Sequence, residues 1–374
     1  MSKRSLPALP VLCLLTLTAA LGIGGCATGP HMSPAINGPH APAIGRGVEF
    51  LIHSQNADGS WGTGTVSCGN EVYSIVPGTH DALRVATTAL CVMALRQAGC
   101  DQPRARGLEY LITHGQARRD NGMLLYNTWA NLYALQALAI EMRYSNDPRI
   151  AAAARWHLER LQRYATYVGG WNYYDFHAQA QSPSMEPTSF GTAAGLVALY
   201  EARRSGLDVP QRMIDLALHR LRDCRLPTGV YLYASELRYH PMMPGNQPPG
   251  AIGRTQPSNY ALWLWGVKDI AAPEARQGLA LFFRYHQAIN MGRKRLIPHE
   301  SWYQTAGYYY YFDHYYAALL IDRLHDAALM QQLAATVAPM QEPDGSWWDF
   351  AMWDYHKPYG TALAVMTLLK CDGE

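Results

Sequence analysis

The chain carries nearly the same phrase close to both ends, QNADGSWG at residues 55–62 and QEPDGSWW at residues 341–348. Each phrase places a Gln four residues before a Gly and six residues before a Trp. Self-similarity of this kind indicates a repeat architecture, in which no single copy can bury its apolar face alone. The phrase therefore constrains the chain to stack copies of one structural unit.

The residues around the first phrase predict what that unit is. Before the phrase, Val48, Leu51 and Ile52 fall on one face of a helix, which indicates an amphipathic helix. After it, residues 85–99 are apolar or small almost all round, which is typical of a helix buried on every side. We predict a unit made of an amphipathic helix, a Gly-aromatic turn, a loop and a buried helix.

Four less similar copies lie between the two phrases, which gives six units with a period of about 55 residues. Open solenoids need capping repeats at both ends, and neither terminal unit reads as a cap. We therefore predict an all-α fold, an α6/α6 toroid over residues 44–374, with six buried helices ringed by six amphipathic ones. The predicted buried helices align on a small or polar residue: Thr88, Asn131, Thr192, Asn259, His314 and Thr361.

The two phrases resemble the QW motif of squalene–hopene and oxidosqualene cyclases, through the residues Gln55, Gly59 and Trp61, and again Gln341, Gly345 and Trp347. Those families and the β subunits of protein prenyltransferases share the α6/α6 toroid, so the resemblance implies the same fold. It also implies a structural role for the motif, in which the Gln meets a helix terminus and the Trp stacks.

The resemblance supports catalysis less well. The DxDD-type acid of class II terpene cyclases does not occur in this sequence. His356 and Tyr359 resemble the His-x-x-Tyr of the third zinc ligand of prenyltransferases, but the preceding unit lacks their Asp-x-Cys pair. Asp313 or His314 offers a substitute ligand, so zinc held by His356, Asp313 and His314 is the cofactor hypothesis.

In a toroid, every loop from an outer helix to the next inner helix lies at the same end. Those loops hold many ionisable residues, among them His80, Asp81, Glu186, His240, His299 and Glu300. Converging carboxylates and imidazoles could carry out acid–base chemistry or hold a metal; solvated loop residues and helix caps are the alternatives. The candidate catalytic residues are Asp175, His177, Asp313, His314, Asp354 and His356. The last four are predicted to lie close together, because their helices are neighbours in the ring.

The stretch WYQTAGYYYYFDHYYAALL, residues 302–320, holds more tyrosines than one face can carry, so some must line the cavity. Aromatic walls suit carbocations, sugar rings and lipid alike. Three function classes follow: a site for an apolar, isoprenoid-like ligand, a carbohydrate-active enzyme, and a scaffold for another envelope protein. The candidate ligand-binding residues are Trp302, Tyr308, Tyr311, Tyr359 and Arg254.

The N-terminal segment predicts a lipid anchor. Residues 11–23 form an apolar run too short to span a membrane comfortably, and Ile23-Gly24-Gly25-Cys26 resembles a bacterial lipobox. We predict a signal peptide at residues 1–25, lipidation of Cys26 and a Pro- and Gly-rich tether at residues 26–43. The membrane would be the partner through this anchor, most simply the outer membrane facing the periplasm. An ordinary cleaved signal peptide is the alternative.

Charge and cysteine content limit other partners. Removal of residues 1–25 takes away Lys3 and Arg4 and leaves 29 Lys and Arg against 29 Asp and Glu. A neutral chain has no electrostatic attraction to nucleic acid, so we expect none as a partner. Five cysteines remain beyond the predicted anchor, and the sequence alone does not reveal whether or how they pair.

Overall fold

A computed structural model of the chain describes residues 36–67, 78–117, 127–172, 186–240 and 242–373. All of them belong to one compact unit, Ser33–Glu374. The predicted signal peptide and Cys26 lie outside the described residues, as do the candidate catalytic residues Asp175 and His177. Among the described helices, none is long and apolar enough to cross a membrane.

The described part of the chain is helical, with only isolated β-bridges. Six helices are buried along nearly their whole length: α2 (Thr79–Gln97), α4 (Thr128–Met142), α6 (Ser189–Arg204), α8 (Pro248–Leu264), α11 (Tyr309–Leu324) and α13 (His356–Cys371). Six others are half-exposed: α1 (Ala41–His53), α3 (Asp101–His114), α5 (Pro148–Tyr164), α7 (Gln211–Asp223), α9 (Ala272–Arg284) and α12 (Ala327–Val337).

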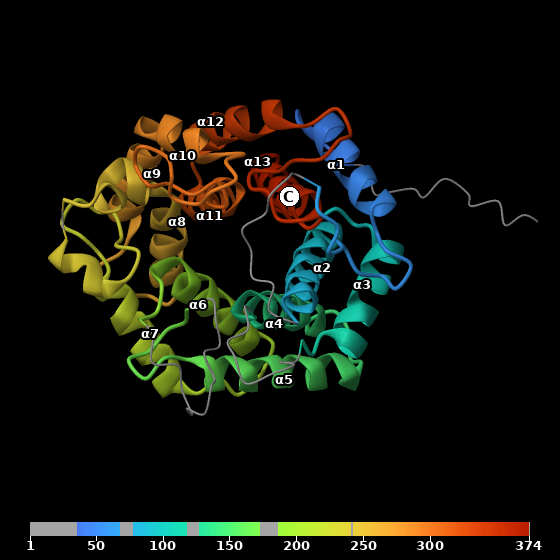
Figure 1. Cartoon of the computed structure of the whole chain (residues 1–374). Helices are drawn as coiled ribbons and strands as arrows, with labels where there is room; N and C mark the ends of the chain where they lie inside the picture. Colours follow the sequence, from blue (N-terminus) through green and yellow to red (C-terminus); the bar gives the residue numbers. More distant parts are fainter. Residues whose placement is uncertain (1–35, 68–77, 118–126, 173–185, 241, 374) are drawn as a thin grey trace, which may run out of the picture. The chain divides into compact units, whose positions relative to one another are not determined.

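The buried helices form a closed inner ring, because each packs against the next and α13 packs against α2 (Figure 1). The half-exposed helices surround this ring and turn their apolar stripes inward, as Ile44, Val48 and Leu51 of α1 do. Burial on all sides explains why the inner helices have no polar face, whereas the outer helices do. The predicted α6/α6 toroid is confirmed.

Three features of the helices go beyond the prediction. Helix α8 begins at Pro248 and continues through Pro257. A proline normally breaks a helix, but burial among neighbouring helices holds this one together. Helix α1 begins at Ala41, inside the predicted tether. A short helix, α10 (His286–Gly292), follows α9 in the fifth unit and was not predicted.

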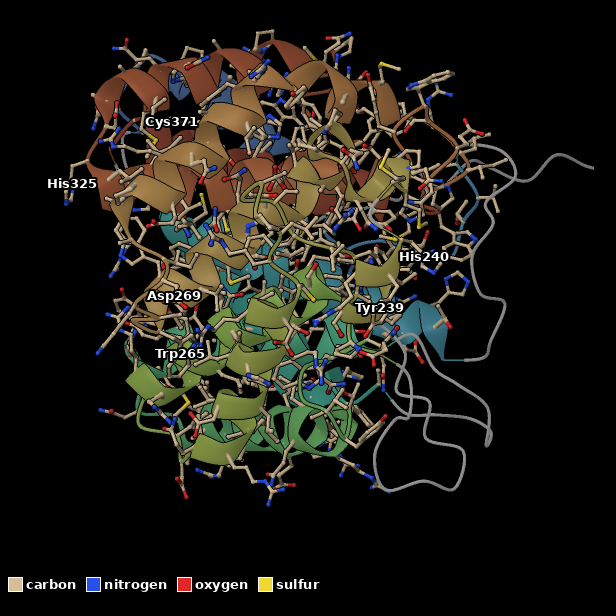
Figure 2. All side chains as sticks on the ribbon, turned by 90° about the vertical axis from the view of Figure 1, so that its left-hand side faces the viewer. Tyr239, His240, Trp265, Asp269, His325 and Cys371 are labelled. Carbon is tan, nitrogen blue, oxygen red and sulfur yellow. The ribbon has the colours of Figure 1, made fainter. Side chains whose placement is uncertain are left out.

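The two ends of the toroid carry different connections. Tyr239 and His240, between α7 and α8, lie at one end, which we call the mouth end (Figure 2). Trp265, Asp269, His325 and Cys371, which lie at or shortly after the C-terminal ends of inner helices, are at the opposite end. The loops from outer to inner helices therefore gather at the mouth end, as the topology predicts.

The first repeated phrase forms a turn that joins the first unit to the next outer helix. Gln55 Nε2 donates to the carbonyl oxygen of Pro103, the third residue of α3, at 2.9 Å, and Arg106 of α3 donates to Gln55 Oε1. The Trp61 indole is fully buried and donates to the carbonyl oxygen of Leu51 at 2.7 Å. The phrase is thus a seam between units, as the family resemblance implied.

The second phrase makes the same contacts on α1. Gln341 Nε2 donates to the carbonyl oxygen of Ala43, the third residue of α1, at 2.8 Å, and Arg46 donates to Gln341 Oε1. The buried Trp347 indole donates to the carbonyl oxygen of Val337 at 3.0 Å. We call residues 55–61 and 341–347 the seam turns. The first unit therefore follows the sixth around the ring, and the phrase near the C-terminus closes the ring onto α1.

The aligned polar residues of the inner helices complete these turns. Backbone N–H groups of Trp61 and Trp347 donate to the hydroxyls of Thr88 and Thr361, at 3.1 and 2.9 Å. The third unit repeats the arrangement without the Gln, since the N–H of Trp171 donates to the Thr192 hydroxyl at 3.2 Å. These threonines therefore satisfy a buried donor in each turn, which is the reason that they recur.

Candidate functional site

A cavity of about 250 Å³ lies inside the inner ring, near the N-terminal ends of the inner helices. Five of the six inner helices contribute to its wall, together with the loops that precede α11 and α13. The lining residues are Leu83, Ala86, Thr87, Leu90, Trp129, Tyr133, Phe190, Pro298, His299, Tyr308, Tyr309, Phe312, Phe350, Met352 and Tyr359. Because these helix ends lie on the side of the outer-to-inner loops, the cavity belongs to the mouth end.

The wall is apolar and rich in aromatic rings. Trp129 stacks on Phe190 with ring centroids 5.8 Å apart, and Phe312 lies edge-on to Trp129 at 5.9 Å. In the described part of the chain, no Asp, Glu, Lys or Arg lines the cavity, and the polar lining groups are Thr87, His299 and the tyrosine hydroxyls. Such a wall binds apolar molecules by burying their surface and stacking against them.

His299 is the one imidazole among the described lining residues. Its backbone is left-handed, with φ of 62°, which is uncommon for a residue with a side chain. Nδ1 lies 2.7 Å from the carbonyl oxygen of Gln304, and Nε2 lies 3.2 Å from the Tyr308 hydroxyl. His299 is exposed to solvent on one side. The protein groups that surround the rest of the ring lower its pKa, and the nearby Arg254 guanidinium adds to this, although the hydrogen bond with Gln304 opposes the shift.

The structure places two of the candidate ligand-binding residues, Tyr308 and Tyr359, in the cavity wall. The Tyr359 hydroxyl donates to the carbonyl oxygen of Tyr308 at 2.9 Å, which joins α13 to the start of α11. The sequence pattern places His299 among the mouth residues but indicates no role for it. Nothing in the sequence around His299 distinguishes it from other loop histidines. Only the folded structure shows that it lines the cavity.

The other three candidate ligand-binding residues lie elsewhere. Trp302 is 78% exposed at the surface. Tyr311 is fully buried outside the lining set, with its backbone N–H donating to Asp349 Oδ2 at 3.0 Å. Arg254 is also buried, and its guanidinium donates to the carbonyl oxygens of Tyr231, Gly250 and Gly245. Arg254 therefore organises backbone at the start of α8.

Asp313 and His314 are both buried on α11, but they make no shared site with His356. Neither carboxyl oxygen of Asp313 has a hydrogen bond of normal geometry, and burial raises its pKa well above the usual range. His314 Nε2 lies 3.0 Å from His286 Nε2, so this ring faces α10 in the outer layer. Burial, followed by the nearby His286, lowers the pKa of His314 to about 3.

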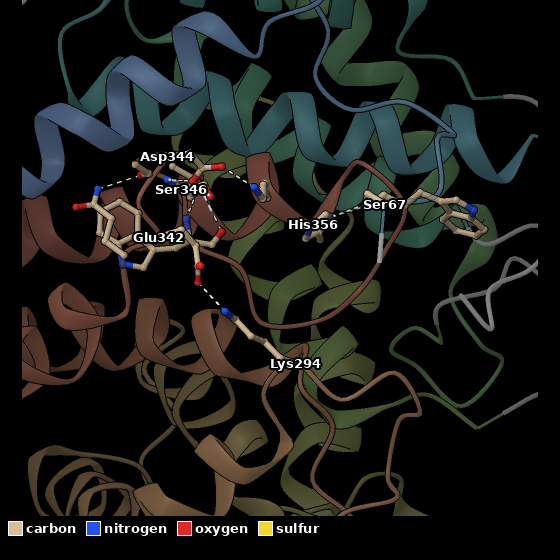
Figure 3. A network of polar contacts seen from close by, with 12 residues as sticks. Ser67, Lys294, Glu342, Asp344, Ser346 and His356 are labelled. Atoms are coloured by element: carbon tan, nitrogen blue, oxygen red, sulfur yellow. Dashed lines mark hydrogen bonds and ion pairs between the residues drawn. The ribbon is translucent and has the colours of Figure 1, made fainter. Parts of the chain in front are cut away.

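Asp354 and His356 join the last unit to the first, and Figure 3 shows the contact between His356 and Ser67. The Thr63 hydroxyl donates to Asp354 Oδ2 at 3.2 Å, and the Ser67 hydroxyl lies 3.5 Å from His356 Nδ1. His356 Nδ1 donates to the carbonyl oxygen of Trp353 at 2.6 Å, and burial lowers the pKa of its imidazole. These two residues therefore help to close the ring at the mouth end.

The described residues contain no group of three or more His, Cys, Asp or Glu side chains placed to hold a metal ion. The predicted zinc set of His356, Asp313 and His314 is therefore not assembled. The physical reason is local. Neighbouring residues on a helix point about 100° apart, so Asp313 and His314 cannot both turn toward α13. Cys91, Cys100, Cys224 and Cys371 are free thiols.

Comparisons with known proteins agree with this fold. No family model matches the chain. It is 31% identical over 220 residues to a probable squalene–hopene cyclase from Sinorhizobium fredii, and the match covers 54% of this chain. The chain spans only 31% of that relative's length.

Two solved structures illustrate the range of proteins with this architecture. A variant of type II terpene cyclase MstE from Scytonema, in complex with its substrate geranylgeranyl dihydroxybenzoate, matches with a TM-score of 0.53 and 16% identity over 89% of this chain and 97% of that chain. An α-1,6-mannanase from Salegentibacter sp. HEL1_6 matches with a TM-score of 0.52 and 10% identity over 88% and 98%. Identities this low show the shared fold alone. The described helical unit is an α/α toroid, a fold that it shares with terpene cyclases and with glycoside hydrolases.

Proposed function

We propose that the toroid binds an apolar, isoprenoid-like molecule in its aromatic cavity, and that Cys26 anchors the protein to a membrane of the cell envelope. The composition of the cavity wall supports the first part of this proposal. Five inner helices contribute apolar side chains to the wall, and none of the described lining residues carries a charge. Each square ångström of apolar ligand surface buried there contributes roughly 25 cal/mol.

The sequence and fold comparisons support an isoprenoid-like ligand. The curated relative is named as a squalene–hopene cyclase, and the MstE variant is described with a geranylgeranyl compound as its substrate. Both names point to branched, apolar chains, which match an aromatic and aliphatic wall. Binding, and not cyclisation, is proposed, because the sequence lacks the DxDD-type acid.

A carbohydrate-active enzyme is the alternative, and the mannanase shows that this fold can serve one. Hydrolysis of a glycosidic bond ordinarily requires two carboxyl groups that flank the bond, at separations of roughly 5 to 9.5 Å. The described cavity wall offers no carboxyl group. The wall therefore favours the apolar ligand over the saccharide.

Exposed apolar residues at the mouth end support a lipid-facing orientation. They lie on two loops that contact each other, since the backbone N–H of Gly245 donates to Gln304 Oε1 at 3.2 Å. The exposed or half-exposed side chains are Tyr239, Met242, Met243, Leu296, Ile297 and Trp302. The run Arg293-Lys294-Arg295 precedes Leu296, and basic residues beside apolar ones are typical of segments that lie at a membrane surface.

Equilibrium binding to the purified full chain tests the ligand class. We expect saturable binding of farnesol and no binding of α-1,6-mannotetraose. Ala86→Phe provides the matched test of location, because Ala86 lines the cavity and a phenyl ring there would fill it. This variant should lose farnesol binding while its thermal unfolding shows that it still folds. Binding of the mannotetraose alone would overturn the proposal in favour of the saccharide reading.

Labelling with tritiated palmitate in a bacterial host tests the anchor. We expect the wild-type chain to incorporate label and Cys26→Ser to incorporate none, because the acyl chain would be attached to this cysteine. Cys91→Ser is the control, since Cys91 is fully buried in the toroid and is not accessible for acylation. Equal labelling of Cys26→Ser and wild type would refute the lipoprotein assignment.

A further inference from the structure

The loop that joins α10 to α11 forms part of the cavity wall and part of the surface. Pro298 and His299 line the cavity, whereas Leu296 and Ile297, directly before them, are 40% and 53% exposed. The hydrogen bonds described for the middle of the loop, residues 295–300, stay within the loop or reach α10. This span therefore lies between the cavity and solvent, and the hydrogen bonds that hold it are local.

The backbone around this span is strained. Five of the described residues other than glycine have a left-handed backbone, and three of them lie in this loop: Lys294, His299 and Gln304, with φ of 62°, 62° and 58°. A side chain makes the left-handed conformation unfavourable, so it persists only where surrounding contacts hold it. When those contacts break, the backbone can relax to other conformations, and the span between Lys294 and Gln304 moves with it.

Lys294 connects the first end of the span to the sixth unit. Its backbone N–H donates to the carbonyl oxygen of Asp349. Its ammonium group pairs with Glu342 at 2.6 Å (Figure 3) and lies over the Trp348 ring, 4.5 Å from the centroid. Both side-chain contacts are partly exposed, and each is weak on its own. Together they can hold the loop in place and still release it.

The other end of the span is attached to a different part of the toroid. The backbone N–H of Gly245 donates to Gln304 Oε1 at 3.2 Å, and the Thr305 hydroxyl donates to the carbonyl oxygen of Pro249 at 3.4 Å. Both partners lie at or just before the start of α8. The span is thus attached at two points, through Lys294 to the sixth unit and through Gln304 and Thr305 to α8.

We propose that residues 295–300 form a flap that opens the cavity to its ligand, and that the Lys294 side chain holds the flap closed. Loss of the Glu342 and Trp348 contacts lets the left-handed backbone relax, which moves the lining residues of the flap away from the cavity. Lids that open in this way control how fast a ligand enters and leaves a site. The ligand in this inference rests on the proposed function, whereas opening of the flap can be measured without a ligand.

A thiol placed inside the cavity measures opening of the flap. Leu90 lines the cavity and is 1% exposed, so a reagent such as N-ethylmaleimide should reach the thiol of Leu90→Cys only after opening. In the full chain with this substitution, Lys294→Met should raise the rate of modification about fivefold, the effect of losing one partly exposed ion pair and a cation–π contact. Mass spectrometry of the modified peptides gives the rate, and the chain without Leu90→Cys gives the contribution of Cys91.

Lys357→Met is the matched control, because Lys357 forms a similar ion pair with Asp344 but belongs to α13 and not to the flap. Cys224 is buried outside the cavity lining and reports unfolding of the whole toroid, so its rate of modification should be the same in all chains. Equal rates at the introduced thiol in the Lys294→Met and Lys357→Met variants, or a parallel rise at Cys224, overturn the flap. An introduced thiol that stays unmodified in every chain overturns it as well.

Glu342→Gln tests the partner of Lys294 in the same way. It should raise the rate of modification about threefold, since it removes the ion pair and leaves the Trp348 contact. The double variant with Lys294→Met should be no faster than Lys294→Met alone, because both changes remove the same pair. Rates that multiply in the double variant would show that the two side chains act separately, and would contradict the closing role of their contact.

Farnesol binding kinetics connect the flap to the proposed function. Lys294→Met should accelerate association and dissociation of farnesol about fivefold each and leave the Kd nearly unchanged, because both steps require the flap to open. A weaker Kd with an unchanged association rate would show that Lys294 shapes the site, and would overturn its role in closing the flap. If farnesol does not bind but Lys294→Met still accelerates thiol modification, the flap is supported and the proposed ligand is rejected.

Discussion

The seam turns and the cavity wall both contain buried aromatic residues, but the surroundings of these residues differ. At Trp347 every polar atom is paired, since the indole N–H donates to Val337 and the backbone N–H to Thr361, and the ring packs against Gly47 without space. At Tyr309 the ring borders empty volume, and the hydroxyl makes no hydrogen bond of normal geometry. Complete pairing stabilises a fold, whereas incomplete pairing beside a cavity leaves room for a ligand.

The units that carry the seam turns also differ from the fifth unit, which contributes to the cavity wall. The first and sixth units carry the full phrase, and their contacts coincide residue by residue. The fifth unit has no such phrase, contains the extra helix α10, and supplies His299, Tyr308, Tyr309 and Phe312 to the cavity. The repeat thus builds the frame, and the irregular fifth unit supplies half of the polar groups in the described wall, namely His299, Tyr308 and Tyr309.

Trp347→Ala should have the largest effect on stability. The indole is fully buried, so its removal leaves a large cavity and unpairs the Val337 carbonyl oxygen. We expect the free energy of unfolding to fall by about 3–5 kcal/mol, and Trp61→Ala to behave alike. Denaturant unfolding of the full chain measures both.

Trp302→Ala is the control for this prediction, because Trp302 is 78% exposed. Its unfolding free energy should stay within about 0.5 kcal/mol of the wild type. If the Trp347 variant unfolds like the Trp302 variant but loses ligand binding, the seam turn has a functional role and the comparison fails.

The ring of helices could be predicted from the sequence because its units repeat. Burial on all sides distinguishes inner from outer helices, and the alignment on Thr88, Thr192 and Thr361 marked positions that prove to accept turn N–H groups. The alignment gave no reason for those threonines, since the donors lie on other segments. The helical ring and the structural role of the motif were therefore predictable, and the hydrogen bonds behind the alignment were not.

The candidate site was less predictable because it depends on side-chain direction. Topology correctly placed the outer-to-inner loops at one end, but it could not tell which residues turn toward the cavity. His314 turns toward the outer layer, and His356 contacts the first unit, although both stand near the N-terminal ends of inner helices. Among the described loop histidines, only His299 lines the cavity, and no local sequence pattern distinguishes it.

Asp349 links the two regions, since it follows Trp347 by two residues and precedes the lining residue Phe350. Burial raises its pKa to about 7, although the N–H of Tyr311 opposes the shift. The folded state therefore binds more protons than the unfolded state between about pH 4 and 7, and stability falls as the pH rises through that window. Asp349→Asn, which keeps an acceptor for Tyr311, should abolish this fall and be more stable than wild type at pH 8, by up to about 4 kcal/mol.

Asp344, in the second of the seam turns, should change the dependence of stability on pH in the opposite direction. Hydrogen bonds from Lys357 and Ser346 outweigh its partial burial and lower its pKa. Its contribution to stability is present at neutral pH and disappears as the pH falls through its folded-state pKa. Asp344→Asn should therefore lose stability at pH 7 but not at low pH. If both Asn variants change the pH profile in the same direction, the burial of Asp349 has been misjudged.

The smallest expected effects come from glycines on one helix, and they test how tightly the seam is packed. A Cβ at Gly47 would lie 2.6 Å from Trp347 Cζ3 and 2.9 Å from Val365 Cγ2, so Gly47→Ala must displace the indole. We expect the unfolding free energy to fall by about 1–3 kcal/mol. A Cβ at Gly45, two residues earlier in α1, meets nothing within 4 Å, and Ala is the better helix former. Gly45→Ala should therefore raise the unfolding free energy by about 0.5–1 kcal/mol. The two Gly→Ala substitutions should therefore change the unfolding free energy in opposite directions, because Gly47 faces the packed seam and Gly45 faces open space. If both substitutions raise it, Trp347 can shift freely.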